Sequence, residues 1–278
     1  MILANITFGT LRGRNRDELE DAVETYLALL SKGGQICGER FLTWTKGRLN
    51  AHVLLAAPQA MSQKSHTEWG RKNLAQIITL FGREPVLKIL DDDAGKTSSG
   101  WRGAPSLYLF TNFIDWYSPV CRGDGKRPVP LFALPVTDRI KEGLYGWQRE
   151  YRALDRIWME SGSLEKQAYR QLAGPLSDLS EEGRRLCREV EDATGVPTFY
   201  YLMRYWARSV GEEDRPCPGC GKAWRRPGDR TGKGFHDFDF SCDPCRLVSH
   251  VGKSVEGARL ARIGEYVPPK PSSRKRKS

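Results

Sequence analysis

Apolar and polar residues follow regular spacings through the first 90 residues of the chain. Apolar side chains recur every three or four positions after Asn15 and again before Phe81, which predicts two amphipathic helices. Short apolar runs bounded by Gly, Pro or turn residues predict strands. The pattern gives six elements in order: a strand at 2–8, a helix from Asn15 to the Gly33–Gly34 stop, strands at 35–44 and 49–57, a helix at 65–81 and a strand at 86–90.

This order, βαββαβ, is that of the split-βαβ, ferredoxin-like arrangement. It predicts an antiparallel sheet with both helices on one face. We therefore expect an α+β protein whose residues 1–115 form a ferredoxin-like N-terminal domain. Residues 116–136 are rich in Gly, Pro and Asp, which predicts a loop-rich connector.

Helical periodicity returns after Thr137. Apolar residues step by three or four along a single stripe that comprises Ile140, Leu144, Trp147, Tyr151, Leu154 and Trp158. A second helix is expected near 164–172, and a third is expected to begin at the cap Ser180 and to end before Gly195. Residues 137–211 are therefore predicted to be a helical region.

Two C-x-x-C knuckles dominate the C-terminal part of the chain. Cys217 and Cys220 form the first pair, and Cys242 and Cys245 form the second pair after 21 intervening residues. Four thiolates satisfy the tetrahedral preference of protein-bound Zn²⁺ and leave no open position for water or substrate. We predict one structural zinc ion in a zinc ribbon over residues 212–252. The alternatives are two chance pairs or a redox pair, but the flanking sequence lacks the βαβ pattern that a redox pair favours.

Positive charge is concentrated near these knuckles. The 278-residue chain has a net charge of +10, and residues 212–278 contribute 15 Lys and Arg against 9 Asp and Glu. Part of this excess lies in a tail predicted to be basic and disordered, residues 253–278. The loop between the knuckles holds the other part, and its cationic and aromatic residues are Lys222, Trp224, Arg225, Arg226, Arg230 and Lys233.

Cations beside an aromatic ring on a rigid metal scaffold suit a nucleic-acid partner, DNA or RNA. Lys and Arg would neutralise phosphates, and Trp224 would offer a stacking face to an unpaired base. The alternative is a solvated loop whose Trp224 packs into the ribbon core. The basic tail would add electrostatic affinity or act only as a solubilising end.

Composition places the protein in a reducing compartment. Outside the knuckles the cysteines are scattered at Cys37, Cys121 and Cys187, which does not suggest a disulfide framework. No apolar run approaches the roughly 18 residues of a membrane span, and the N-terminus lacks a secretory signal. The sequence predicts a cytoplasmic protein without a membrane partner.

Catalytic signatures are weak. Asp91, Asp92 and Asp93 are consecutive, so their carboxylates point in different directions, and a solvated turn is favoured over a Mg²⁺ site. Gly95–Thr97 resembles the end of a phosphate-binding loop, but Leu90 stands where the first glycine of that motif is required. We find no Ser/His/Asp or Cys/His set. The sequence favours a binding protein, and a nucleic-acid-processing enzyme is the least favoured hypothesis.

The segments C-P-G-C-G-K-x-W and F-D-F-S-C-D-P-C-R-L-V-S, within residues 196–252, resemble a bacterial family of uncharacterised proteins. That family is described as containing a zinc ribbon and as a candidate for nucleic-acid binding. The resemblance implies metal-ligand roles for Cys217, Cys220, Cys242 and Cys245, together with a nucleic-acid partner. The rival hypothesis is an adaptor whose ribbon and N-terminal domain bind a protein partner.

Overall fold

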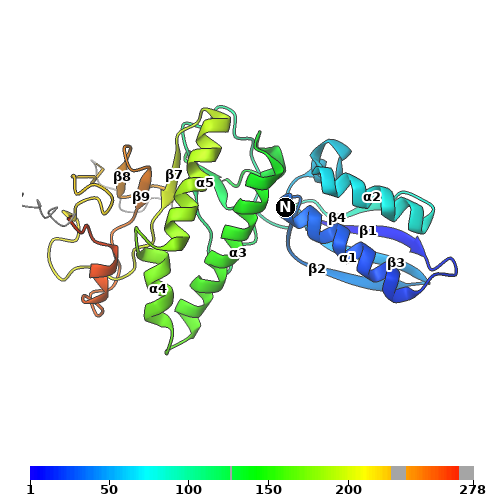
Figure 1. Cartoon of the computed structure of the whole chain (residues 1–278), viewed down its shortest axis with the longest axis horizontal. Coiled ribbons are helices and arrows are strands. Elements are labelled where there is room, and N and C mark those ends of the chain that lie inside the picture. The colour runs from blue at the N-terminus through cyan, green and yellow to red at the C-terminus, as the bar shows by residue number, and fades with distance from the viewer. Residues whose placement is uncertain (126, 227–235, 269–278) are drawn as a thin grey trace, which may run out of the picture.

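The computed structural model describes residues 1–125, 127–226 and 236–268. The molecule is elongated (Figure 1). A sheet domain that contains the N-terminus forms one end, long helices form the middle, and the hairpin that carries the second cysteine pair lies at the other end. In the described part of the chain, no helix has both the length and the apolar character needed to cross a membrane.

A four-stranded sheet with the order β2-β3-β1-β4 organises the N-terminal end. All neighbouring strands in it are antiparallel. Its strands are β1 (Ile2–Thr10), β2 (Ile36–Thr45), β3 (Arg48–Leu55) and β4 (Val86–Asp91), and its helices are α1 (Arg16–Lys32) and α2 (Glu68–Phe81). Short 3-10 turns, η1 (Pro58–Met61) and η2 (Gln63–Ser65), precede α2.

One core joins this sheet to both helices. Because side chains alternate between the two faces of a strand, every second residue of β1 and β3 is buried: Ile2, Ala4, Ile6, Phe8, Leu49, Ala51, Val53 and Leu55. The buried faces of α1 and α2 pack into the same cluster. The other face of the sheet mixes polar and apolar side chains, and there Thr7 Oγ1 donates to Asn50 Oδ1 at 2.7 Å. The hydrophobic pattern therefore directs both helices to one face.

Local signals in the sequence place the ends of these elements. The Asn15 side chain caps α1 by accepting from the backbone N–H of Asp17 at 2.8 Å. The β2–β3 hairpin turns through Lys46 and Gly47, with φ angles of 51° and 73°. This is the pair of positive φ values that the commonest two-residue hairpin requires, so the predicted turn at residues 45–48 is confirmed.

A second, five-stranded sheet with the order β6-β5-β7-β9-β8 organises the rest of the chain. Its strands are β5 (Leu107–Leu109), β6 (Val120–Arg122), β7 (Thr198–Tyr201), β8 (Phe240–Cys242) and β9 (Leu247–Ser249). Strand β7 is parallel to β5 on one side and to β9 on the other, while the outer pairs are antiparallel. The α+β class is confirmed.

Helices α3 (Asp138–Glu160), α4 (Glu165–Ala173) and α5 (Asp178–Thr194) share one large core with this sheet. The predicted stripe supplies Ile140, Leu144, Trp147 and Tyr151 to it. The same cluster contains Cys217 and Cys242. The cysteine-bearing segment and the helices are therefore parts of one packed unit.

The structure differs from the expected division of the chain. Strands β5 and β6, expected in the N-terminal domain and in the connector, belong to the second sheet, so the first sheet ends at Asp91. The region predicted to be helical, 137–211, contains β7. The cap of α5 is Ser177 rather than Ser180, which is buried and donates to the Tyr200 hydroxyl.

Residues 253–268 are folded, although the sequence predicted a disordered tail from residue 253. A 3-10 turn, η4 (Leu260–Gly264), buries Ala261, whose carbonyl accepts from Arg204. Tyr266 packs so closely on Gly221 that a Cβ there would lie 2.7 Å from the tyrosine ring. The fold thus continues past the knuckles, and residues 269–278 lie outside the described residues.

A buried histidine gives the N-terminal domain a pH dependence. His66 Nδ1 donates to the Ser62 carbonyl, so its Nε2 accepts from the Tyr26 hydroxyl at 2.8 Å. Burial lowers the pKa of His66 below its ordinary value of 6.5. Since the unfolded chain takes up the proton first, the free energy of unfolding should fall as pH drops through about 6.5. Urea titrations of the protein at about pH 7.5 and about pH 5.5 measure this loss of stability. Unfolding of the domain is followed by pulsed hydrogen exchange in the peptides that cover α1.

His66→Gln should flatten this pH dependence, because the substituted side chain does not titrate. Tyr26→Phe is the matched control: it removes the hydroxyl and keeps the buried imidazole, so the pH dependence should persist. If the free energy of unfolding of His66→Gln depended on pH as it does in the wild-type protein, another group would be the one that titrates.

Candidate metal centre

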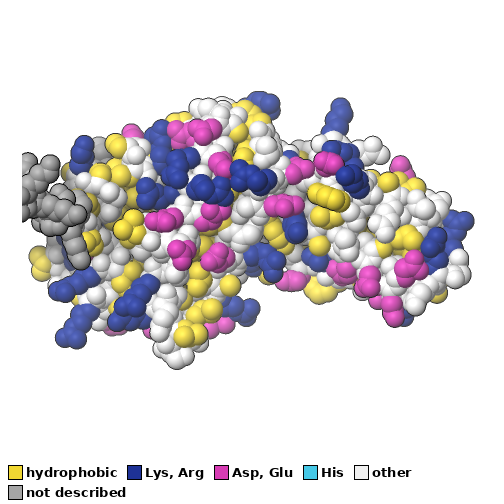
Figure 2. Space-filling model, in the orientation of Figure 1, with side chains coloured by type: hydrophobic (Ala, Val, Ile, Leu, Met, Phe, Trp, Pro, Cys, Tyr) yellow, Lys and Arg dark blue, Asp and Glu magenta, His cyan; other side chains and the backbone are white. Residues whose placement is uncertain are grey.

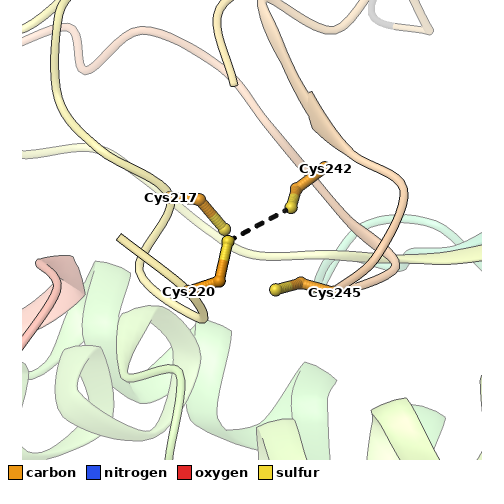
Figure 3. Close-up of side chains that lie close together, drawn as sticks. All are labelled: Cys217, Cys220, Cys242 and Cys245. Atoms are coloured by element: carbon orange, nitrogen blue, oxygen red, sulfur yellow. Dashed lines mark hydrogen bonds between the residues drawn. The ribbon is translucent and has the colours of Figure 1, made fainter. Parts of the chain in front are cut away.

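Four cysteine side chains converge at the end of the second sheet (Figure 3). The sulfur atoms of Cys217, Cys220, Cys242 and Cys245 all lie within 4.8 Å of one another. Cys220 Sγ is 3.7 Å from Cys242 Sγ, and four thiolates placed tetrahedrally at about 2.3 Å from Zn²⁺ would be about 3.8 Å apart. Within the described residues this is the one cluster suited to a metal ion. The four cysteines can therefore hold a metal, and the spacing fits zinc.

The first knuckle is a tight turn closed by its own backbone. Cys217 N–H donates to the Lys222 carbonyl, and Gly221 N–H donates to the Cys217 carbonyl, both at 2.8 Å. Gly221 has a φ of 72°, a conformation that glycine adopts without strain. Gly219 is needed for space, because a Cβ at this position would lie 2.8 Å from Cys245 Sγ. The two glycines let the turn aim both of its sulfurs at one point.

The second knuckle sits on the β8–β9 hairpin, in which Cys242 pairs with Leu247. Arg246 occupies the place that Gly221 has in the first knuckle, and it also has a positive φ, 49°. Its guanidinium forms two hydrogen bonds with the Glu191 carboxylate, at 2.7 and 2.9 Å. Because a bidentate pair of this kind has a defined geometry, Glu191 of α5 holds the second knuckle against the helices.

The thiols differ in their surroundings. Cys217 is fully buried, and burial raises its pKa to about 11. Burial also raises the pKa of Cys245, whereas the backbone N–H of Lys222 lowers the pKa of Cys220. Four thiolates packed this closely would repel one another, so a divalent cation is their natural partner. With four sulfur ligands the coordination sphere is filled, which suits a structural role.

A buried ionic network joins the cysteine segment to the rest of the fold. The Glu212 carboxylate accepts from Arg204 at 2.7 and 2.9 Å and lies 3.2 Å from Arg215 Nε. Burial by itself would raise the pKa of Glu212, but the hydrogen bonds from Arg204 hold it below its ordinary value. Arg215 also donates to Ser249 Oγ at 2.9 Å, and its guanidinium lies 4.2 Å from the centre of the Phe240 ring. This network fixes the approach to the first knuckle.

The proposed nucleic-acid residues do not share one environment. Trp224 is only 3% exposed, packs on Phe240 and donates from Nε1 to the Arg215 carbonyl. Trp224 is therefore a residue of the ribbon core, which is the alternative considered above. Its buried ring does not support base stacking. Arg225 lies near the carboxylates of Glu213 and Asp239, at 3.4 and 3.5 Å.

Lys222 and Arg226 differ from Arg225 in having no nearby carboxylate among the described residues. In the described part of the chain, no carboxylate lies within 4 Å of either side chain, and the Lys222 side chain is exposed. The backbone N–H of Arg226 donates to the Asp239 carbonyl, which fixes this segment beside β8. Arg230 and Lys233 lie outside the described residues.

A groove that the sequence did not indicate lies beside the second knuckle. It has a volume of about 400 Å³ and is lined by Arg226, His236 and Arg246 together with aromatic rings of β5 and β7, Tyr108 and Phe199. These residues come from separate segments, and Tyr108 is more than 100 positions from the cationic residues. Sequence reasoning missed the groove because only the pairing of β5, β7 and β9 brings them together.

Fold and site together define an α+β protein with a four-cysteine cluster, a candidate metal centre, built into its second sheet. Three family models match successive parts of the chain, each described as a domain of unknown function: DUF8589 over residues 1–91, DUF2310 over residues 102–203 and DUF8594 over residues 207–254. The last of these contains all four cysteines.

Two proteins of Haemophilus influenzae are similar to the chain, and both are described as uncharacterized proteins. One is 36% identical over 163 residues, which cover 58% of this chain and 76% of that relative. The other is 34% identical over 167 residues, which cover 59% of this chain and 62% of that relative. The chain belongs to the same protein family as the first of them. No solved structure matches the chain.

Removal of the metal should loosen more than the knuckles. Because β9 pairs with β7, and because Cys217 and Cys242 belong to the core formed with the helices, chelation should speed hydrogen exchange in β7, β8 and β9. The core of β1, β3 and α1 is separate, so exchange there should not change. Exchange mass spectrometry before and after chelation, with zinc added back, measures both regions.

Cys220→Ser should reproduce the effect of chelation and reduce the metal content, while Cys37→Ser, in the N-terminal domain, should leave the metal content unchanged. Unchanged protection of β7 in the metal-free protein would show that the centre does not support the second sheet.

Gly219→Ala tests the packing of the knuckles directly. The added Cβ would overlap Cys245 Sγ, so metal affinity should fall about 10- to 100-fold, as it does when groups around a metal site are disturbed. Competition with a chromogenic chelator measures this affinity. Gly146→Ala is the matched control, because a Cβ at this position in α3 meets no atom within 4 Å. Equal affinities of the two variants would mean that the knuckles can spread apart.

Proposed function

We propose that the protein binds nucleic acid through the surface beside a structural zinc ion held by the four cysteines. The zinc assignment is supported by the sulfur separations and by the closed, all-thiolate ligand set. The nucleic-acid assignment is supported by the residues that follow the first knuckle. In this proposal the ion has no chemical step to perform, and its role is to fix the backbone on which the cations stand.

One observation carries the proposal: two cations on the segment after the first knuckle, Lys222 and Arg226, have no carboxylate within 4 Å among the described residues. Arg226 lies in the lining of the groove beside the second knuckle together with Arg246 and His236, and Lys222 is exposed on the same segment. Backbone phosphates pair with such cations. Tyr108 and Phe199 are only 1% and 9% exposed, so, like Trp224, they offer no open face for base stacking, and the proposal rests on phosphate contacts.

The helical face is a weaker candidate surface. Figure 2 shows Lys and Arg side chains interspersed with Asp and Glu over the middle of the molecule. Several of these cations are paired, as in the contacts of Arg185 with Glu182 and Glu189 at 2.5 and 2.8 Å. A face of mixed sign gives little net attraction for a polyanion.

A second candidate function, binding of a protein partner, rests on an apolar groove near the first knuckle. This groove has a volume of about 910 Å³ and is lined by Leu176, Pro218, Ile263 and Val267, among others. Leu176 and Val267 are 75% and 76% exposed. Exposed apolar surface of this kind is typical of interaction sites. This groove is therefore the candidate binding surface under the adaptor hypothesis.

An enzymatic function has less support. Asp91 Oδ1 accepts from the backbone N–H of Asp93 in a local turn. Among the residues that the structure describes, the three aspartates do not gather with other potential ligands into a metal cluster. We therefore keep the binding function as the proposal.

We also infer a ferredoxin-like N-terminal domain and a cytoplasmic location. The first inference rests on the sheet order β2-β3-β1-β4, the antiparallel pairing and the single core shared with both helices. The second rests on the scattered, buried cysteines Cys37, Cys121 and Cys187 and on the four-cysteine cluster, which suit a reducing compartment.

A salt titration of oligonucleotide binding tests the proposal. Lys222→Ala combined with Arg226→Ala should weaken binding of short single-stranded DNA or RNA. Each lost phosphate contact lowers the slope of log affinity against log salt by about 0.7, so the double variant should lower it by about 1.4. Fluorescence anisotropy at a series of salt concentrations measures affinity and slope.

Lys64→Ala combined with Arg83→Ala is the control, because both side chains are exposed on the N-terminal domain and the net charge changes equally. It should leave the slope unchanged. Equal slopes of log affinity against log salt in the two double variants would show that Lys222 and Arg226 do not contact the nucleic acid. Absence of binding by the zinc-loaded wild-type protein at low salt would contradict the proposal and leave the apolar groove as the site to study.

A further inference from the structure

A third cavity lies between the N-terminal domain and the helices, on the side of the helices away from the four-cysteine cluster. Its volume is about 300 Å³. Its walls come from the end of α1, the start of β2, the segment at residues 116–118 and one face of α3. Cavities of this size, at a junction between domains, are common places for small-molecule ligands.

Positive charge dominates the lining of this cleft. The cationic lining residues are Lys32, Arg40, Arg149 and Arg152, and the acidic one is Glu39. Arg40 is already paired with Glu24 at 3.0 Å. In the described part of the chain, no carboxylate lies within 4 Å of Lys32, Arg149 or Arg152. The cleft therefore holds an excess of cations without counter-ions.

Arg152 is the most informative of these side chains. Its guanidinium lies 3.8 Å from the centre of the Trp116 ring and donates from Nη2 to the Phe113 carbonyl at 3.2 Å. Its Nε is buried and has no hydrogen-bond partner among the described residues. Burial lowers its pKa. A partly buried cation without a carboxylate is costly unless an anion accompanies it.

The scaffold holds Arg152 in place on both sides. Trp116 packs against Gly38, where a Cβ would lie 3.1 Å from the indole ring and where φ is 70°. The neighbouring Gln148 side chain donates to the Tyr117 carbonyl. Arg149, one residue further along α3, is exposed and lies over the Tyr145 ring. The fold thus fixes the aromatic wall and leaves two guanidinium groups beside an open volume.

We propose that this cleft binds the phosphate group of a small phosphorylated molecule, with Arg149 and Arg152 as the principal ligands and Lys32 as a further cation. Planar guanidinium groups match the oxygens of a phosphate. The volume, about 300 Å³, admits a molecule of mononucleotide size and excludes a folded partner. Glu39 would oppose the ligand's charge and so limit its affinity.

Calorimetric titration of the full-length, zinc-loaded protein with AMP and with adenosine tests the proposal. AMP should bind, adenosine should bind at least about tenfold more weakly, and inorganic phosphate should compete with AMP. Arg149→Ala and Arg152→Gln should each weaken AMP binding about tenfold or more, as expected for lost hydrogen bonds to a charged group. Glu39→Gln should strengthen AMP binding severalfold.

Arg156→Ala is the matched control, because Arg156 follows Arg152 by one helical turn, pairs with Glu160 at 3.0 Å and is absent from the lining. It should not change AMP affinity. Arg152 also packs on Trp116, so Arg149→Ala, which removes an exposed side chain, keeps the test valid if Arg152→Gln fails to fold.

Three results would overturn the proposal: no AMP binding at millimolar concentration, equal affinities for AMP and adenosine, or unchanged AMP affinity in Arg149→Ala. Oligonucleotide binding at the knuckle surface should not respond to Arg149→Ala. The failure of one site can therefore be distinguished from the failure of the other.

Discussion

The structure depends most on the convergence of four cysteine sulfurs within 4.8 Å of one another. Two of these residues, Cys217 and Cys242, are also core residues of the unit formed by the second sheet and the long helices. Strand β9, which follows the second knuckle, pairs with β7 in the middle of that sheet. A metal ion at this point would hold the two knuckles together. Because the second knuckle joins β8 to β9, the ion would also stabilise this edge of the sheet. The centre is thus a constraint on the whole C-terminal unit.

Charge is used in three ways along the molecule. Glu212, Arg204 and Arg215 are buried and paired, and they hold the segment before the first knuckle in place. Lys222 and Arg226 have no carboxylate partner in the described structure; Arg226 lines the groove beside the knuckles, and Lys222 is exposed on the same segment. Arg149 and Arg152 line the cleft near the N-terminal domain. Net charge alone does not separate these roles; the partner of each cation does.

Sequence periodicity predicted the elements that are long enough to show a period. The strands of the first sheet, α1, α2, α3 and the Lys46–Gly47 turn all followed from local patterns. The second sheet did not, because β5, β6, β8 and β9 have three residues each and β7 pairs with segments far away in sequence. The cysteine cluster was predictable from its spacing. The burial of Trp224, the Arg246–Glu191 pair and both cavities were not, since each depends on contacts between distant segments.

X-ray absorption spectroscopy at the zinc edge, on protein purified without added metal, tests the central claim most directly. The account predicts one zinc ion per chain with four sulfur neighbours at about 2.3 Å and no oxygen or nitrogen ligand. A substoichiometric metal, or a first coordination shell that contains oxygen or nitrogen, would contradict the assignment of a closed, structural four-cysteine centre.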